Sequence, residues 1–175
     1  MFARIIPVLV CLFIAALPAQ AKKTCEQLLA NDASMFTTRD NPQMAASCMG
    51  NGVCLVTISA KDNRPAWLHL GRTVKSDQWV LRLQLLEAKA DISEGIQVSF
   101  DGRDAENIPS EFLDVKNGGA LVIFRNEIQQ VLLDETKKAG KSRWSLVSSK
   151  GKKLQFDMSH SGLSNAIAWI NCKVK

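Results

Sequence analysis

Two histidines are the residues of this chain best suited to acid–base chemistry, since imidazole is the side chain whose ordinary pKa lies near neutrality. His160 follows Asp157 closely and precedes Ser161, which together supply the residue types of a Ser-His-Asp triad. Triad partners normally come together from separate segments, however, and the sequence contains no Gly-x-Ser-x-Gly elbow. We therefore expect a loop histidine beside a helix-capping Ser161.

His69 lies in the alternating run Trp67-Leu68-His69-Leu70, which predicts a strand with His69 and Trp67 on one face. A hydrogen-bonded structural role is the expectation for such a histidine. We predict no enzyme activity and no cofactor, because neither histidine is accompanied by a catalytic set and the glycines form no phosphate-binding run. The alternative is a periplasmic enzyme that uses His69 or His160.

Carboxylates crowd one segment and raise the question of a cation site. They are Asp101, Asp104, Glu106 and Glu111. Their spacing lacks the alternating pattern of a calcium-binding loop, so we predict a solvated turn region and no metal site.

The first 21 residues have the organisation of a secretory signal peptide. Arg4 precedes an apolar stretch over residues 8–17, and Ala19-Gln20-Ala21 suits cleavage by signal peptidase. The stretch is too short for a spanning helix, which needs about 20 apolar residues, and no later run approaches that length. We expect a periplasmic or secreted protein that has no transmembrane segment after cleavage.

Export to an oxidising compartment predicts that the cysteines of the mature chain form two disulfides. These cysteines are Cys25, Cys48, Cys54 and Cys172. A zinc site is less well supported, because no C-x-x-C pair occurs and both histidines are distant in sequence. Three pairings are open. In each of them Cys172 closes a long loop, which stabilises a folded chain by about 4–5 kcal/mol on the chain-entropy account.

From Val53 onward the chain reads as a succession of short strands. The alternation of apolar and polar residues is clearest over residues 78–85. Asn117-Gly118 predicts a hairpin turn, because asparagine and glycine both tolerate a positive φ. The predicted strands cover residues 54–60, 67–73, 78–85, 96–100, 112–116, 120–124, 143–147 and 154–158. This spacing predicts a mainly β fold, an antiparallel β-sandwich or barrel-like sheet, with two helices and stabilised by disulfides.

Two helices are predicted, at residues 126–139 and 161–170. In the first, Asn126 is the expected N-cap and Gln129 completes a capping box. In the second, apolar residues recur with the spacing of one buried helical stripe.

One β-rich domain over residues 53–175 is the expected organisation, since the sequence shows no internal repeat or linker. Residues 22–52 differ in texture, with a short helical pattern near Cys25 followed by a polar stretch. We predict that they form an N-terminal lead-in held to the domain by disulfides.

The charge is mixed along most of the chain, with 22 basic and 17 acidic residues, and tyrosine is absent. This composition argues against a nucleic-acid partner. One segment is uniformly basic and contains Lys137, Lys138, Lys141, Arg143, Lys150, Lys152 and Lys153. If the helix end and the hairpin fold together, these residues make a patch for phosphate, lipopolysaccharide or an acidic partner surface. The alternative is a solvated hairpin tip.

Four landmarks occur in order between Cys54 and Cys172. They are Cys54-Leu55, Gly95-Ile96-x-Val98-x-Phe100-Asp101-Gly102, Phe112 followed by Gly118, and Gly162-Leu163-x-x-Ala166-Ile167. In order and spacing they resemble the invasion-associated locus B family of exported bacterial proteins. That family commonly has Phe-x-x-Cys-x-x-Gly-Cys, where this chain has Val115 and Gly119 at the cysteine positions. The resemblance implies a small β-rich periplasmic or surface protein, linked in some members to entry into host cells, with no catalytic residues to transfer.

The sequence therefore predicts an exported, non-enzymatic envelope or secreted protein that binds a protein or envelope component. A contribution to host-cell invasion follows from the resemblance alone. Besides the enzyme considered above, the alternative is a secreted inhibitor of an enzyme such as lysozyme, for which a disulfide-pinned β-domain with a basic hairpin is suitable.

Overall fold

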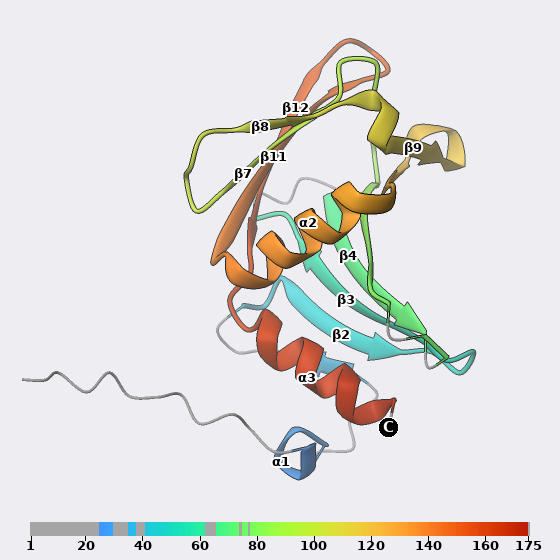
Figure 1. The fold of residues 1–175 in the computed structure, drawn as a ribbon, viewed down its shortest axis with the longest axis vertical. Coiled ribbons are helices and arrows are strands. Elements are labelled where there is room, and N and C mark those ends of the chain that lie inside the picture. The colour runs from blue at the N-terminus through green and yellow to red at the C-terminus, as the bar shows by residue number, and fades with distance from the viewer. Residues whose placement is uncertain are drawn as a thin grey trace, which may run out of the picture.

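The fold consists of two antiparallel sheets and three helices around one hydrophobic core (Figure 1). The computed structural model describes residues 25–29, 35–37, 41–61, 66–73, 75–76 and 78–174. The predicted signal peptide lies outside these residues. Within them the sheets remain open at their edges and no closed barrel forms, so the predicted mainly β fold is confirmed in its packed-sheet form.

The larger sheet has seven strands in the order β1-β2-β3-β4-β5-β10-β9. Their bounds are Met35–Thr37 for β1, Met44–Cys48 for β2, Val53–Ser59 for β3, Ala66–Thr73 for β4, Val80–Leu85 for β5, Leu113–Lys116 for β9 and Leu121–Phe124 for β10. Apolar residues alternate along the central strands, so that Leu68 and Leu83 are fully buried while their neighbours face outward. The sheet therefore has one face on the core and one open face.

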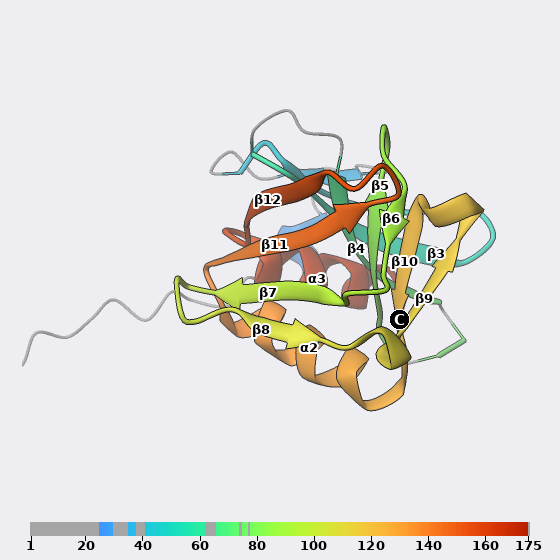
Figure 2. The same cartoon turned by 90° about the horizontal axis from the view of Figure 1, so that it is seen from above.

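The smaller sheet has the order β12-β11-β7-β8, with β6 paired to β11 beyond the end of β7. Figure 2 shows its long strands side by side. The bounds are Ala90–Asp91 for β6, Ile96–Phe100 for β7, Glu106–Ile108 for β8, Lys141–Ser148 for β11 and Lys153–Ser159 for β12. Trp144 of β11 is fully buried and its ring centroid lies 5.5 Å from that of Phe124 on β10. This aromatic contact joins the two sheets.

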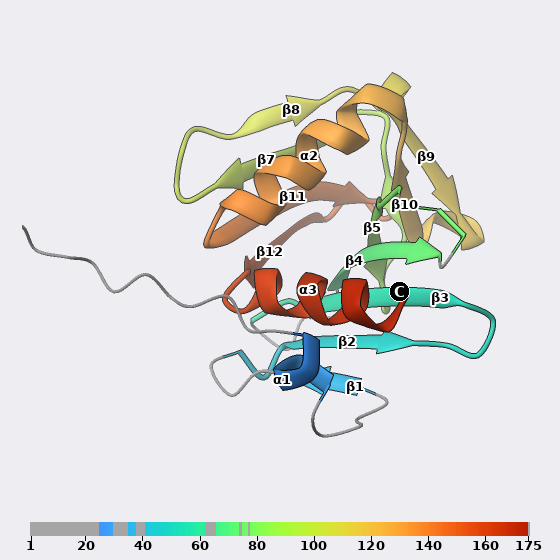
Figure 3. The same ribbon diagram turned by 60° about the horizontal axis from the view of Figure 1, so that its bottom comes forward.

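Helices cover the core face of the larger sheet. The helices are α1 at Cys25–Leu29, α2 at Asn126–Lys138 and α3 at Leu163–Lys173, with 3-10 turns at Ser110–Phe112 and Asn117–Gly119. Figure 3 shows α3 lying along β2 and β3 with α1 beside it. On α3, Trp169 is buried and contacts Phe36 of β1. The buried side of α3 thus closes one end of the core.

Both predicted disulfides form, and the structure decides their pairing. Cys25 bonds to Cys172 and ties α1 to α3 across 147 residues of chain. Cys48 bonds to Cys54, which is its direct partner across the β2–β3 hairpin.

Strands β1, β2, β6 and β8 were not predicted. Met44–Cys48 is the most important of them, because it belongs to the segment predicted as a lead-in yet lies within the larger sheet, with Met44 and Ala46 buried. Alanine and serine have little preference for strands, and pairing with β3 supplies the order that the local sequence does not.

The helix caps differ from the prediction. The N-cap of α2 is Arg125, whose carbonyl already accepts the amide of Gln129, so Asn126 is the first helical residue and the predicted capping box is wrong. In α3 the N-cap is Gly162, with a φ of 84°, rather than Ser161. The helix also continues to Lys173, which brings Cys172 onto it.

The hairpin between β9 and β10 forms at the predicted place but has a longer loop. Asn117 and Gly118 have positive φ, at 52° and 64°, as predicted. Gly119 is also positive, at 94°, and Lys116 pairs with Leu121, so residues 117–120 connect the strands. This loop packs against Ala90, whose carbonyl oxygen would lie 3.1 Å from a Cβ at Gly119.

Candidate functional site

His160 is buried in a fixed hydrogen-bond network at the end of β12. Its Nδ1–H donates to the carbonyl of Ala139 at 3.1 Å, and its Nε2 accepts the hydroxyl proton of Ser142 at 2.9 Å. The indole Nε1 of Trp144 donates to the same hydroxyl oxygen at 2.9 Å. Burial lowers the pKa of His160, so the ring is neutral near pH 7. Asp157 instead pairs with Arg143, so the triad suggested by sequence adjacency does not assemble.

His69 lies on the open face of the larger sheet, with both ring nitrogens engaged. Thr57 donates its hydroxyl proton to Nδ1 at 3.1 Å, and Nε2–H donates to Oε1 of Gln84 at 3.0 Å. Partial burial, aided by the nearby positive charge of Arg82, lowers the pKa of His69. The side chain has the hydrogen-bonded role that the sequence predicts, on the same strand face as Trp67.

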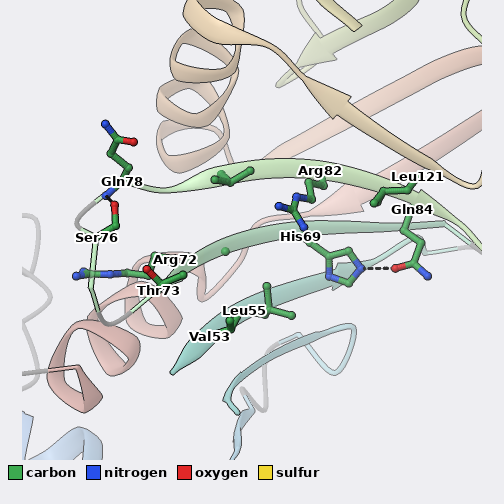
Figure 4. A pocket seen from close by; sticks show the side chains of 12 residues that line it. Val53, Leu55, His69, Arg72, Thr73, Ser76, Gln78, Arg82, Gln84 and Leu121 are labelled. Carbon is green, nitrogen blue, oxygen red and sulfur yellow. Dashed lines mark hydrogen bonds between the residues drawn. The ribbon is translucent and has the colours of Figure 1, made fainter. Parts of the chain in front are cut away.

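A hollow of about 410 Å³ lies on this open face, over strands β3, β4, β5 and β10 (Figure 4). Its apolar lining consists of Val53, Leu55, Val80 and Leu121, and its polar lining includes His69, Arg72, Arg82 and Gln84. No carboxylate belongs to the lining that the structure describes.

The two arginines of the hollow are held differently. Arg72 donates from Nη1 to Oδ1 of Asn171 at 2.7 Å, and its guanidinium lies 5.8 Å from the ring centroid of Trp79. Arg82 is exposed and is the direct cross-strand neighbour of His69. Within the described part of the chain Arg82 forms neither an ion pair nor a hydrogen bond, so its charge remains available to a ligand.

The seven basic residues predicted as one patch lie in two places. Lys141 pairs with Ser159 at one end of β11, whereas Lys153 pairs with Val147 near the other. A strand rises about 3.3 Å per residue, which puts these ends roughly 20 Å apart. The expectation that the helix end and the hairpin form one patch is therefore wrong, because most of the length of β11 lies between them.

The lysines at the helix end are partly neutralised. Lys137 lies 4.0 Å from Asp134, and Lys138 lies 3.8 Å from Glu135. Arg143, on β11, pairs with Asp157 at 2.7 Å. These exposed pairs reduce the positive potential at this end of the strand.

The hairpin lysines are joined by a cation that the sequence analysis did not include. The amide of Ser149 donates to the carbonyl of Lys89 at 2.8 Å, which holds the β11–β12 turn against the β5–β6 loop. The side chain of Lys89 extends toward the β9–β10 loop, where its Nζ would lie 3.7 Å from a Cβ added at Gly118. We call Lys89, Lys150, Lys152 and Lys153 the lysine tip. None of the four is ion-paired within the described residues.

The crowded carboxylates are exposed, as predicted for a turn region. Asp101 has a structural role, because its Oδ1 accepts the backbone N–H groups of Gly140 and Lys141 at 2.9 and 3.1 Å. In the part of the chain that the structure describes, no group of three potential metal ligands comes together. None of the described helices combines the length and apolar character needed to cross a membrane.

The hollow was not predicted from the sequence, although a signal for it is present in the alternation of the strands. Outward-facing positions on β3, β4 and β5 carry Leu55, Gly71 and Val80 side by side. An apolar row on the face that should meet water is such a signal, but the pairing of the strands is needed to see it.

A solved structure with a similar fold is that of invasion associated protein B from Bartonella henselae. The TM-score is 0.51 with 13% sequence identity, and the match covers 75% of this chain and 93% of the other. This likeness shows a shared fold and a distant structural relationship. The chain matches no protein-family model, and the search of curated proteins gives no match. The two disulfides and this structural neighbour are consistent with an extracytoplasmic protein.

Proposed function

We propose that this chain is a periplasmic or secreted, non-enzymatic binding protein of the bacterial envelope and a divergent member of the invasion-associated locus B family. The shared fold and the two disulfides support this assignment. A contribution to host-cell invasion is the finer role suggested by the name of the structural neighbour. A deletion strain that enters host cells as well as its parent would contradict that finer role alone.

The observation that carries the binding role is the lysine tip. The β11–β12 turn and the β5–β6 loop bring four lysines to one end of the molecule, and no described carboxylate forms an ion pair with them. A concentrated positive potential at a projecting tip steers association with an acidic protein surface. The positions of the two histidines support a non-enzymatic role, because the hydrogen bonds described above occupy all four ring nitrogens.

The test compares the two groups of basic residues, those at the β11–β12 turn and those near the end of α2. A variant with Lys150, Lys152 and Lys153 changed to Glu is compared with a matched control in which Lys137, Lys138 and Lys141 are changed to Glu. Partners captured by crosslinking in the native envelope are identified by mass spectrometry, and the affinity for the principal partner is followed over a salt titration. We expect the tip variant to lose binding and the control to retain most of it, with thermal stability similar in both. Equal binding by both variants would contradict the proposed role of the tip.

A further inference from the structure

Gly71 of β4 belongs to the lining of the hollow on the open face of the larger sheet. A Cβ on Gly71 would lie 2.8 Å from Cδ2 of Leu55, so the side chain of Leu55 occupies the space above the glycine. Val80 lies on the other side of Gly71 in the strand pairing. The floor is therefore apolar, with the side chains of Leu55 and Val80 on the two strands beside Gly71.

One side of the hollow offers hydrogen-bond donors and positive charge. Arg82 and Gln84 are two residues apart on β5 and point to the same face (Figure 4). Because Oε1 of Gln84 accepts the proton of His69, its amide NH₂ group remains a donor. The guanidinium of Arg82 adds a charge that no described carboxylate satisfies. These two groups are suited to the oxygens of an anion.

The volume and charge select the kind of ligand. Small-molecule sites have volumes of roughly 300–1,000 Å³, are mainly apolar and carry a few convergent polar groups, and the hollow of about 410 Å³ fits this description. One available guanidinium beside a neutral histidine matches a single negative charge better than the two charges of a phosphate monoester.

We propose that this hollow binds a medium-chain alkyl carboxylate, with its alkyl chain along Leu55 and Val80 and its carboxylate on Arg82 and Gln84. This site is separate from the lysine tip and does not depend on it.

The experiment titrates the oxidised, full-length mature protein with decanoate below its micelle-forming concentration, following backbone amides by NMR and heat by calorimetry. Decanol tests whether the alkyl chain binds without a carboxylate, and acetate tests whether a carboxylate binds without a long alkyl chain. We expect saturable binding of decanoate with shifts centred on Gly71 and Gln84. Arg82→Gln should weaken decanoate binding roughly tenfold or more while leaving decanol binding unchanged. Arg143→Gln on the other sheet is the matched control and should bind like the parent.

Gly71→Val tests the hollow itself. The φ of Gly71 is not in the positive region, and valine suits a strand, so the fold is expected to tolerate a side chain that displaces only the end of Leu55. This variant should lose binding of both decanoate and decanol. The proposal is overturned if decanoate fails to saturate, if Gly71→Val binds it normally, or if Arg82→Gln leaves its affinity unchanged. Binding of a peptide with a free C-terminal carboxylate in place of decanoate would also overturn it.

Discussion

The Nε2 atom of His160 lies 2.9 Å from the Oγ atom of Ser142, and the two residues are only 4% and 3% exposed. Because the hydroxyl proton of Ser142 is donated to the ring, and the ring's own proton is donated to Ala139, the pair has no proton to give to a substrate. The pair instead fastens the end of β12 to the segment between α2 and β11. It has the composition of a catalytic dyad and the surroundings of a core.

Replacing His160 by Ala is expected to destabilise the protein by about 2–4 kcal/mol. The change leaves a cavity and removes the hydrogen-bond partners of Ser142 and Ala139. Urea unfolding monitored by tryptophan fluorescence measures the effect. His69→Ala is the comparison and should cost less, because His69 is only partly buried. A smaller loss for His160→Ala than for His69→Ala would contradict this account.

Stability should fall as the pH drops below about 6.5, the usual pKa of histidine in an unfolded chain. Burial lowers the pKa of both histidines in the folded state, so the unfolded chain binds more protons in this range. The stabilisation is complete above the unfolded value and is lost toward the lower folded values. Urea unfolding at pH 7.5 and pH 5.5 tests this before most carboxylates titrate. His160→Gln should reduce the difference, and identical wild-type stability at both pH values would refute the prediction.

The two disulfides should differ in their contribution to stability. On the chain-entropy account, closing the 147-residue separation of Cys25 and Cys172 contributes about 5 kcal/mol, and closing the 6-residue separation of Cys48 and Cys54 about 2 kcal/mol. Double alanine variants of each pair, unfolded in denaturant without reductant, measure the two losses. Non-reducing peptide mapping of the wild type should recover these two pairings. A larger loss for the Cys48–Cys54 variant would show that native packing, rather than loop entropy, decides the ranking.

Gly118 and Gly119 should respond differently to substitution. Both have positive φ, but a Cβ at Gly118 has no atom closer than 3.7 Å, whereas one at Gly119 would meet Ala90 and Lys89 at 3.1 Å. Gly118→Asn is therefore expected to be nearly neutral, and Gly118→Val to destabilise by about 1 kcal/mol or more. Gly119→Asn should be worse than Gly118→Asn because of the contact. Thermal melting of the three variants gives the order, and equal melting temperatures for the two Asn variants would contradict it.

Local sequence was sufficient where a segment carries its own pattern. The run from Ile96 to Phe100 alternates strictly and forms β7 with the predicted bounds. The Asn117-Gly118 pair placed a hairpin because few other residue types accept positive φ. The four cysteines that follow the predicted signal peptide indicated two disulfides, but left their pairing open.

Tertiary structure decided what depends on residues distant in sequence. Strand β2 has a weak pattern of its own and forms by pairing with β3. The basic residues divide into two groups because β11 separates them, and Lys89 joins the tip through a contact between loops about sixty residues apart. The hollow over Gly71 requires three strands in register. Periodicity fixes which face of a strand is apolar, whereas the neighbours of each side chain are set by pairing and packing, which a single segment does not encode.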